Sequence, residues 1–494
     1  MKEHAPVLIV VFPIMFAFIT PLLGWIRKSL CYPWVILALS LSTICSLITL
    51  EEVMTGGVIH YYLGSWLPPW GIEYVVDHLN AMMLVIVSGA ALLVAIYSRR
   101  SIEAELPGKM VYFYTIFLLQ TTGFLGIVVT GDMFNLYVFL EIASLAGYTL
   151  IAIGEDGAPL ASFRYIIMGT VGACFYLLGV GYLYMVTGSL NMADLATIIP
   201  LISDSKVVLT AFAFFMAGIA IKMALFPLHV WLPDAYTRAP STSSALIAPL
   251  MTKISVYVMI RIFFTVFNPS FTVDVLPATD ILLWLGTIAI FGGAIMALAQ
   301  TDFKRMLCYI VVAEVGYMVG GIGVANSIAM QGAVLHLLND AVMTLGLFIV
   351  AGIVTYQMKG HLLSDFNALF RKMPLTMVTF VVVALSVIGV PPTCGFFSKW
   401  YLLQGGIMAG AWGFVVALLL SSLINIILFF RIFELGYVFQ SDGSHHDHGH
   451  GGFIHEAPAS MLLPSVVVAL GILAIGIYNQ VIINNIITYV IPKF

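Results

Sequence analysis

The stretch AGIAIKMALFPLHVWLPDA, residues 217–235, decides how this chain is built. It is apolar enough to lie in a membrane, yet Lys222 stands in it five residues before Pro227. A proline inside a membrane helix removes a backbone hydrogen bond, and the freed carbonyl is tolerated at depth only where protein or water satisfies it. The stretch therefore predicts a broken transmembrane helix with a buried cation beside the break.

A second stretch repeats this pattern near the other end of the chain. SVIGVPPTCGFFSKW, residues 386–400, places Pro391 and Pro392 shortly before Lys399. Two interrupted helices at corresponding places in two halves indicate a transport site built from inverted repeats. A proline kink that serves only packing is the alternative, and a lysine beside each break argues against it.

The composition excludes most other classes of protein. Of 494 residues, 61% are hydrophobic and only 9% are charged, with a net charge of −4. A soluble globular protein carries about 25% charged residues. A soluble enzyme, a nucleic-acid binder, a disordered chain and a disulfide-rich secreted domain are therefore excluded. The five cysteines form no CxxC pair, so we expect no cofactor and no iron–sulfur or zinc cluster.

Fourteen apolar segments predict an all-α polytopic membrane protein. Spans 4–8 and 9–13 would form two inverted five-helix repeats, broken at spans 7 and 12, because an odd number of spans inverts the second half. The expected organisation is three N-terminal spans (1–105), the first repeat (106–270), the second repeat (275–440), a His-rich cytoplasmic loop (441–458) and span 14 (459–494).

The basic residues predict the orientation. Thirteen Lys and Arg fall in alternate loops and span ends, whereas the opposite loops and termini hold only Lys2, Lys206 and Lys493. Because basic loops stay inside, we expect cytoplasmic basic loops, outside termini and insertion in the cytoplasmic membrane of a prokaryote.

Four basic residues remain, all within apolar segments. Arg261 lies near the end of its span and can reach outward, whereas Lys222, Lys253 and Lys399 cannot. An ionised side chain at the bilayer centre costs at least about 2.5–3.5 kcal/mol. Either each lysine is paired with a carboxylate to fix helix packing, or the lysines form a proton relay. Several in one chain favour the relay.

Buried acids would partner these lysines. Glu141 is the only charged residue in YVFLEIASLAGYTLI, residues 137–151, while Glu314, Asp340 and His336 also lie at apparent membrane depth. A carboxylate beside a lysine favours the ammonium, and moving the carboxylate away makes the lysine release its proton. A structural role and a proton-transfer role stay open for Glu314 and Asp340.

These stretches resemble a known family. KMALFPLHVWLPDAYTRAPSTSSALIAPLMTKISVYVMIR (222–261) is similar to the core signature of the antiporter-like membrane subunits of respiratory complex I, Mrp-type cation/proton antiporters and membrane-bound hydrogenases. TDFKRMLCYIVVAEVGYM (301–318), GVPPTCGFFSKW (389–400) and HEAP (455–458) follow in family order. The resemblance covers about residues 75–460, and the chain's length is similar to that of the D-type subunit of Mrp antiporters.

The resemblance implies a role for individual residues. It implies that Glu141 and Lys222 form an ion pair that acts as the input switch and that Lys253 passes the proton on. It implies further roles for four residues: His336 continues the route, Lys399 is the exit residue, Asp234 caps or pins the broken helix and His229 hydrogen-bonds along the polar axis.

The chain departs from the family pattern in two spans. The eleventh span usually carries His, a second His four residues on and Lys four further, whereas HLLNDAVMT gives His336, Asp340 and Thr344. The tenth span carries Glu314 where Gln is frequent. The central route therefore depends on Asp340 with water, and the extra acids suit cation binding as well as proton transfer.

The loop SDGSHHDHGHGGFIHEAP, residues 441–458, is rich in histidine. His445, His446, His448 and His450 have a spacing that binds Zn or Ni loosely. Its flexible Gly-rich flanks favour a solvated linker.

Three hypotheses follow. The leading one is a proton-translocating subunit for Na⁺/H⁺ antiport of the Mrp type, with a homologous antiporter-like subunit and small membrane subunits as partners. The alternative is an ion-pumping subunit of a membrane-bound hydrogenase or other complex I-like respiratory complex, in which enzymatic chemistry takes place on other subunits. The third is a carbon-concentrating complex or a structural paralogue that does not pump. Copurifying subunits would distinguish the three.

Overall fold

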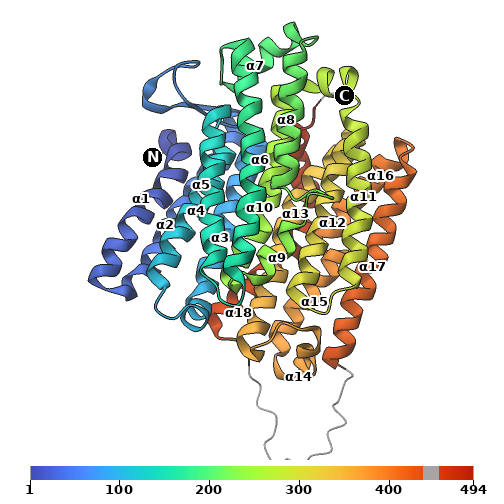
Figure 1. Ribbon diagram of the computed structural model, residues 1–494. Helices are drawn as coiled ribbons and strands as arrows, with labels where there is room; N and C mark the ends of the chain where they lie inside the picture. The colour runs from blue at the N-terminus through green and yellow to red at the C-terminus, as the bar shows by residue number, and fades with distance from the viewer. Residues whose placement is uncertain (1, 438–455, 493–494) are drawn as a thin grey trace, which may run out of the picture.

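The computed structural model describes residues 2–437 and 456–492, and it is a bundle of long helices (Figure 1). The helices are α1 (Ala5–Ile26), α2 (Cys31–Gly56), α3 (His78–Glu105), α4 (Met110–Val129), α5 (Met133–Ala152), α6 (Ala158–Thr187), α7 (Met192–Ile198), α8 (Lys206–Lys222), α9 (Trp231–Arg238), α10 (Ser241–Ile260), α11 (Ala278–Leu298), α12 (Phe303–Gly323), α13 (Ser327–Met358), α14 (Leu369–Lys372), α15 (Pro374–Ile388), α16 (Cys394–Met408), α17 (Trp412–Tyr437), α18 (Ala459–Ile477) and α19 (Asn479–Asn485). Two π-helical segments, Arg261–Val266 and Ser270–Val275, follow α10. Strands β1 (Ile59–Tyr62) and β2 (Glu73–Val76) pair antiparallel, with Ile59 opposite Val76.

The polytopic membrane fold is confirmed. In the described part of the chain, twelve helices are long and apolar enough to cross a membrane. The seventh and twelfth expected spans are not among these twelve, because each is divided into two shorter helices. The total of fourteen spans, the inverted-repeat symmetry and the domain boundaries stay predictions.

Both broken helices lie where the sequence places them. Helix α8 ends at Lys222, and α9 begins at Trp231 beyond the Pro227 turn. Helix α15 ends at Ile388, and its C-terminal cap, Gly389, has a φ of 95°, which only glycine adopts without strain. The half-helices therefore expose their terminal backbone groups inside the bundle.

Helices α10, α12 and α13 form the centre of the bundle. In the apolar window of each, 94%, 100% and 94% of the residues are buried, respectively. Helix α13 packs against α10 on one side and α16 on another. This arrangement puts the polar residues of three different spans within reach of α13.

Glycines hold α11 against α12. A Cβ at Gly293 would lie 2.6 Å from the backbone nitrogen of Ala313, and one at Gly316 would lie 2.7 Å from the carbonyl of Gly286. No larger side chain fits at these positions, so the two backbones pack at close range, as in small-residue membrane interfaces.

Side chains of Asp and Asn begin several helices. Asp132 accepts a hydrogen bond from Asn135 N at the start of α5, and Asp302 accepts one from Arg305 N at the start of α12. Such caps satisfy backbone N–H groups that have no partner within the helix.

Both ends of the described chain lie toward the α7 end of the bundle, and α14 lies at the opposite end (Figure 1). This placement agrees with an even number of spans. Which end faces the cytoplasm stays a prediction from the basic residues. The weak metal candidates His445, His446, His448 and His450 lie outside the described residues.

Candidate functional site

The first polar cluster lies where α5 passes the break after α8. Lys222 is buried, and its Nζ donates a hydrogen bond to Ser144 Oγ at 2.7 Å. Glu141 lies three residues before Ser144 on the same face of α5, and Glu141 Oε1 has no hydrogen-bond partner. The direct contact of the Lys222 ammonium in this conformation is thus the Ser144 hydroxyl, and the Glu141–Lys222 switch implied by the resemblance stays a prediction.

The second cluster joins α10 to α13. Lys253 is fully buried, and its Nζ lies 2.9 Å from Asp340 Oδ2 and 3.2 Å from Thr344 Oγ1. Thr344 in turn donates to Asp340 Oδ1 at 2.7 Å. Asp340 and Thr344, the two residues that depart from the family pattern, are thus the direct partners of Lys253.

The third cluster joins α12, α13 and α16. Glu314 Oε2 lies 2.6 Å from His336 Nε2, and Glu314 Oε1 lies 3.9 Å from Lys399 Nζ. His336 Nδ1 lies 2.9 Å from Ser398 Oγ. The Lys399 ammonium also donates to the Val387 carbonyl at 2.5 Å and lies 4.9 Å from the centre of the Tyr317 ring. Every one of these side chains is buried.

One face of α13 connects the second and third clusters. His336, Asp340 and Thr344 follow one another at four-residue intervals, which places them on one side of the helix about 6 Å apart along its axis. His336 belongs to the third cluster, and the other two belong to the second. A charge leaving Lys253 therefore needs to move only about one helical turn to reach the third cluster.

Further buried polar groups lie beside the first two clusters. Gln120 on α4 lies next to Gly147 on α5, and neither atom of its side-chain amide has a protein partner. The Thr252 hydroxyl, next to Lys253 in the chain, also has none. Internal water is the usual partner of buried groups of this kind.

His229 and Asp234 take different places from those expected. The His229 ring stacks on Phe226, and its Nδ1 has no hydrogen-bond partner, so the hydrogen bond along the polar axis that the resemblance implies is not formed by this nitrogen. Asp234 does not cap α9. It pins the helix instead, because its carboxylate binds Arg164 at 2.8 Å and Arg305 at 3.1 Å.

A network of charged and polar groups lies at the C-terminal end of α10. Arg261 binds Asp77 at 2.5 Å, and it also contacts Asn80 and Tyr257. Its side chain is only 12% exposed, so its charge is satisfied by Asp77 at the end of the span and not by bulk water. Burial would raise the pKa of Asp77, but the guanidinium and the backbone hydrogen bonds outweigh it and hold that pKa below its ordinary value of 3.8.

We expect Asp77→Asn to lower the thermal unfolding temperature of the purified complex, since a charge-assisted hydrogen bond contributes about 1.5–3 kcal/mol. The folded-state pKa of Asp77 is lowered, so its stabilisation is complete above the ordinary value and is lost as pH falls through the folded value. The difference between variant and wild type should therefore stay constant from about pH 5 to pH 8 and shrink only below about pH 4. A difference that shrinks between pH 5 and 8 contradicts this assignment.

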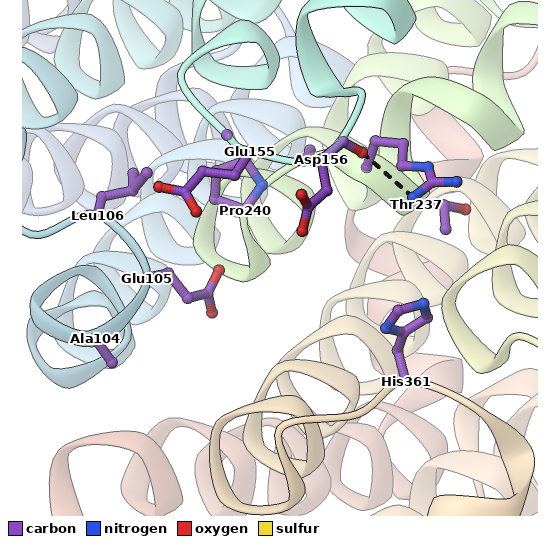
Figure 2. A pocket seen from close by; sticks show the side chains of 11 residues that line it. Ala104, Glu105, Leu106, Glu155, Asp156, Thr237, Pro240 and His361 are labelled. Carbon is purple, nitrogen blue, oxygen red and sulfur yellow. Dashed lines mark hydrogen bonds between the residues drawn. The ribbon is translucent and has the colours of Figure 1, made fainter.

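A cavity of about 370 Å³ opens at the end of the bundle that carries Arg238 and His361. Figure 2 shows the side chains of Glu105, Asp156 and His361 facing the same space. The Glu105 carboxylate accepts a hydrogen bond at 2.7 Å from the backbone of Ser241, the first residue of α10. An acidic cavity thus lies against the end of the helix that carries Lys253.

The structure adds partners that the sequence reading missed. Ser144, Tyr317 and Ser398 each contact a predicted residue. Helical spacing was the available signal, since Ser144 follows Glu141 by three residues and Tyr317 follows Glu314 by three. Among the described residues, no group of three or more His, Cys, Asp or Glu is arranged to hold a metal ion.

Known sequences similar to this chain are membrane subunits of NADH-quinone oxidoreductases and of Na⁺/H⁺ antiporters. The family model described as NADH:quinone oxidoreductase/Mrp antiporter, transmembrane, matches residues 130–425. NADH-quinone oxidoreductase subunit N of Desulforudis audaxviator is 45% identical, over 100% of this chain and 99% of its own. The D subunit of the Na⁺/H⁺ antiporter of Alkalihalophilus pseudofirmus is 32% identical, over 80% of this chain and 78% of its own.

Solved structures share the fold. A chain of the archaeal membrane-bound sulfane sulfur reductase, a respiratory membrane complex, is 28% identical with a TM-score of 0.89, and 99% of this chain and 97% of that chain are covered. A chain of the Mrp complex of Dietzia sp. DQ12-45-1b has a TM-score of 0.87 over 99% and 97% of the two chains. At 22% identity, the second likeness concerns the fold alone.

Proposed function

This chain belongs to the NADH:quinone oxidoreductase/Mrp antiporter transmembrane family, as an antiporter-like subunit of a multisubunit membrane complex, and we propose that it carries protons along the three polar clusters. The observation that carries this proposal is the shared face of α13. Through His336 and Asp340, that face contacts the Glu314–Lys399 cluster and Lys253. The relatives named as Na⁺/H⁺ antiporter subunits support ion transport.

The proposed route has three stages. A proton reaches Lys222 near Glu141, crosses to Lys253 through water at the unpartnered Gln120 amide, and passes along α13 to His336. From there it moves through Glu314 to Lys399, which releases it. Each stage joins two groups that bind protons, and Ser144, Thr344 and Ser398 hold the lysines and the histidine in place.

Charge coupling would drive these transfers. A nearby carboxylate stabilises a buried ammonium, because taking an unpaired charge out of water costs several kcal/mol. When a proton leaves Lys253, Asp340 loses its counter-ion and attracts the next positive charge. The state of each cluster therefore sets the state of its neighbour, which is what a pump needs to couple distant steps.

We infer that the acidic cavity near Glu105 is the cytoplasmic entrance. The clustering of Arg238, Lys304, Arg305 and Lys359 at this end supports the cytoplasmic assignment through the positive-inside rule. Carboxylates at a cavity mouth raise the local concentration of protons and cations. The termini would then face outward.

For the coupled ion, we propose Na⁺ in exchange for H⁺, as in Mrp-type antiport. Support comes from the relatives named as D subunits of Na⁺/H⁺ antiporters and from the additional buried acids Glu314 and Asp340. The two five-helix units, residues 106–270 and 275–440, would each hold one broken helix, and the partners would be other membrane subunits of the same complex.

A second candidate is an ion-pumping subunit of a complex I-like respiratory complex. The observation that favours it is the 45% identity over the full chain to a subunit named NADH-quinone oxidoreductase subunit N. In that complex the redox chemistry would take place on other subunits, and the same proton route would serve it. Copurification with redox subunits, rather than with small membrane subunits alone, would select this candidate.

The test is the ΔpH across everted vesicles that contain the whole complex. Lys399→Ala should reduce the Na⁺-dependent signal by about tenfold or more, because the last proton carrier is lost while Glu314 keeps its His336 contact. Lys206→Ala, the same change at an exposed lysine, is the control and should transport normally. An assembled Lys399→Ala complex with wild-type flux would show that protons travel elsewhere.

A further inference from the structure

The groups around the Lys399 ammonium are those of a cation-binding site. The ammonium donates a hydrogen bond to the Val387 carbonyl at 2.5 Å, lies 3.9 Å from Glu314 Oε1 and lies 4.9 Å from the centre of the Tyr317 ring. Carboxylates, freed backbone carbonyls and aromatic faces all attract cations. One group of each kind, the Glu314 carboxylate, the Val387 carbonyl and the Tyr317 ring, lies around this ammonium at the last turn of α15.

The C-terminal end of the half-helix α15 adds to the attraction for a cation at this site. Its first turn is capped by the Glu456 carboxylate, which accepts hydrogen bonds from Leu375 N and Thr376 N. Its last turn, which bears the negative end of the helix dipole, ends at the break and offers the Val387 carbonyl. Leu385 O is already taken by Gly389 N and Val390 N, whereas Val387 O accepts from the Lys399 ammonium.

Glu314 is held so that one oxygen is left for a cation. His336 takes Oε2 at 2.6 Å, and Oε1 is buried without a hydrogen-bond partner. The titratable groups that face Lys399 are Glu314 and Tyr317 from α12 and Asp340 from α13, and His336 from α13 holds the other oxygen of Glu314. Among the contacts of the described residues, helix α15 presents only the Val387 carbonyl to the ammonium.

We propose that Na⁺ and the Lys399 ammonium compete for one site, formed by the Glu314 carboxylate and the Val387 carbonyl at the break after α15. When Lys399 loses its proton, the neutral amine leaves the site and Na⁺ takes its place, so the charge beside Glu314 is conserved. One Na⁺ bound therefore means one proton released. This deepens the proton-carrying role proposed above and rests on it for the release of the Lys399 proton.

The experiment is equilibrium binding to the purified complex, without transport. Radioactive Na⁺ binding and proton release are measured together in weakly buffered solution, with choline chloride as the ionic-strength control. Wild type should release about one proton per Na⁺ bound at this site, and its Na⁺ affinity should rise by up to about tenfold per pH unit. Glu314→Gln should weaken Na⁺ binding about tenfold or more, while Asp280→Asn, an exposed carboxylate, should not.

A second variant separates competition from simple binding. Lys399→Ala should still bind Na⁺, but without proton release and with no dependence on pH. Proton release that persists in Lys399→Ala, binding that Glu314→Gln leaves unchanged, or equal proton release by K⁺ would each overturn the sodium site. Because vesicle ΔpH is measured separately, loss of this site with intact proton flux leaves the proton route standing.

Discussion

Lys253→Met is expected to stop proton transport, with a loss of about a hundredfold or more, and to destabilise the subunit by about 3–5 kcal/mol. Lys253 is fully buried, and Asp340, its partner at 2.9 Å, is nearly so. Removing the lysine leaves a buried carboxylate without its counter-ion. Thr344 can still donate one hydrogen bond to Asp340, but it brings no charge.

The double variant Lys253→Met with Asp340→Leu separates stability from transport. Replacing both charges by apolar side chains removes the unpaired group, so assembly and thermal stability should return to near the wild-type level. Transport should remain lost, because no group at this position can bind a proton. The measurements are the thermal unfolding temperature and the ΔpH of everted vesicles. Recovered transport in the double variant would show that the pair serves packing alone.

His336→Gln is expected to lower proton transport about a hundredfold or more while the complex assembles normally. Glutamine can hydrogen-bond to both Glu314 and Ser398, the two partners of the histidine, but it does not take up a proton at accessible pH. His336 joins the second and third clusters through α13, so the route should break at this point. Vesicle ΔpH and complex yield are the readouts.

A matched control for this prediction is Ser398→Ala. It removes the hydrogen bond to His336 Nδ1 at 2.9 Å but leaves the imidazole able to accept and donate protons. Its transport should fall far less than that of His336→Gln. If the two variants lose transport equally, then the orientation of the ring, and not its titration, is what the cluster needs.

The fold could be read from the sequence because membranes impose few solutions. Continuous apolar runs of about 20 residues must be helices, and prolines beside Lys222 and Lys399 mark the breaks with little ambiguity. The structure places both breaks there. What the sequence could not supply was the set of contacts around α13, since helix rotation is set by packing between distant segments.

The sequence was enough to predict which charged residues belong to the candidate site, but not which residues contact each other there. Lys222, Lys253 and Lys399 stood out because ionisable residues are rare in apolar spans. Their partners did not: Ser144 replaces Glu141 as the direct contact of Lys222, and Asp340 serves Lys253 from another span. Such choices depend on which rotamers fit between helices, and small hydroxyl residues carry no charge signal in a sequence.

The close packing of α11 on α12 has a mechanical consequence for the third cluster. Ala313, the neighbour of Glu314, lies against Gly293 with no room for a methyl group. Helix α16, which carries Lys399, packs on α13 equally closely, since a Cβ at Gly405 would lie 2.5 Å from the backbone nitrogen of Ala329. The backbones on both sides of the third cluster are therefore fixed against their neighbours, and a change in the distance between the Glu314 carboxylate and the Lys399 ammonium falls to side-chain rotation.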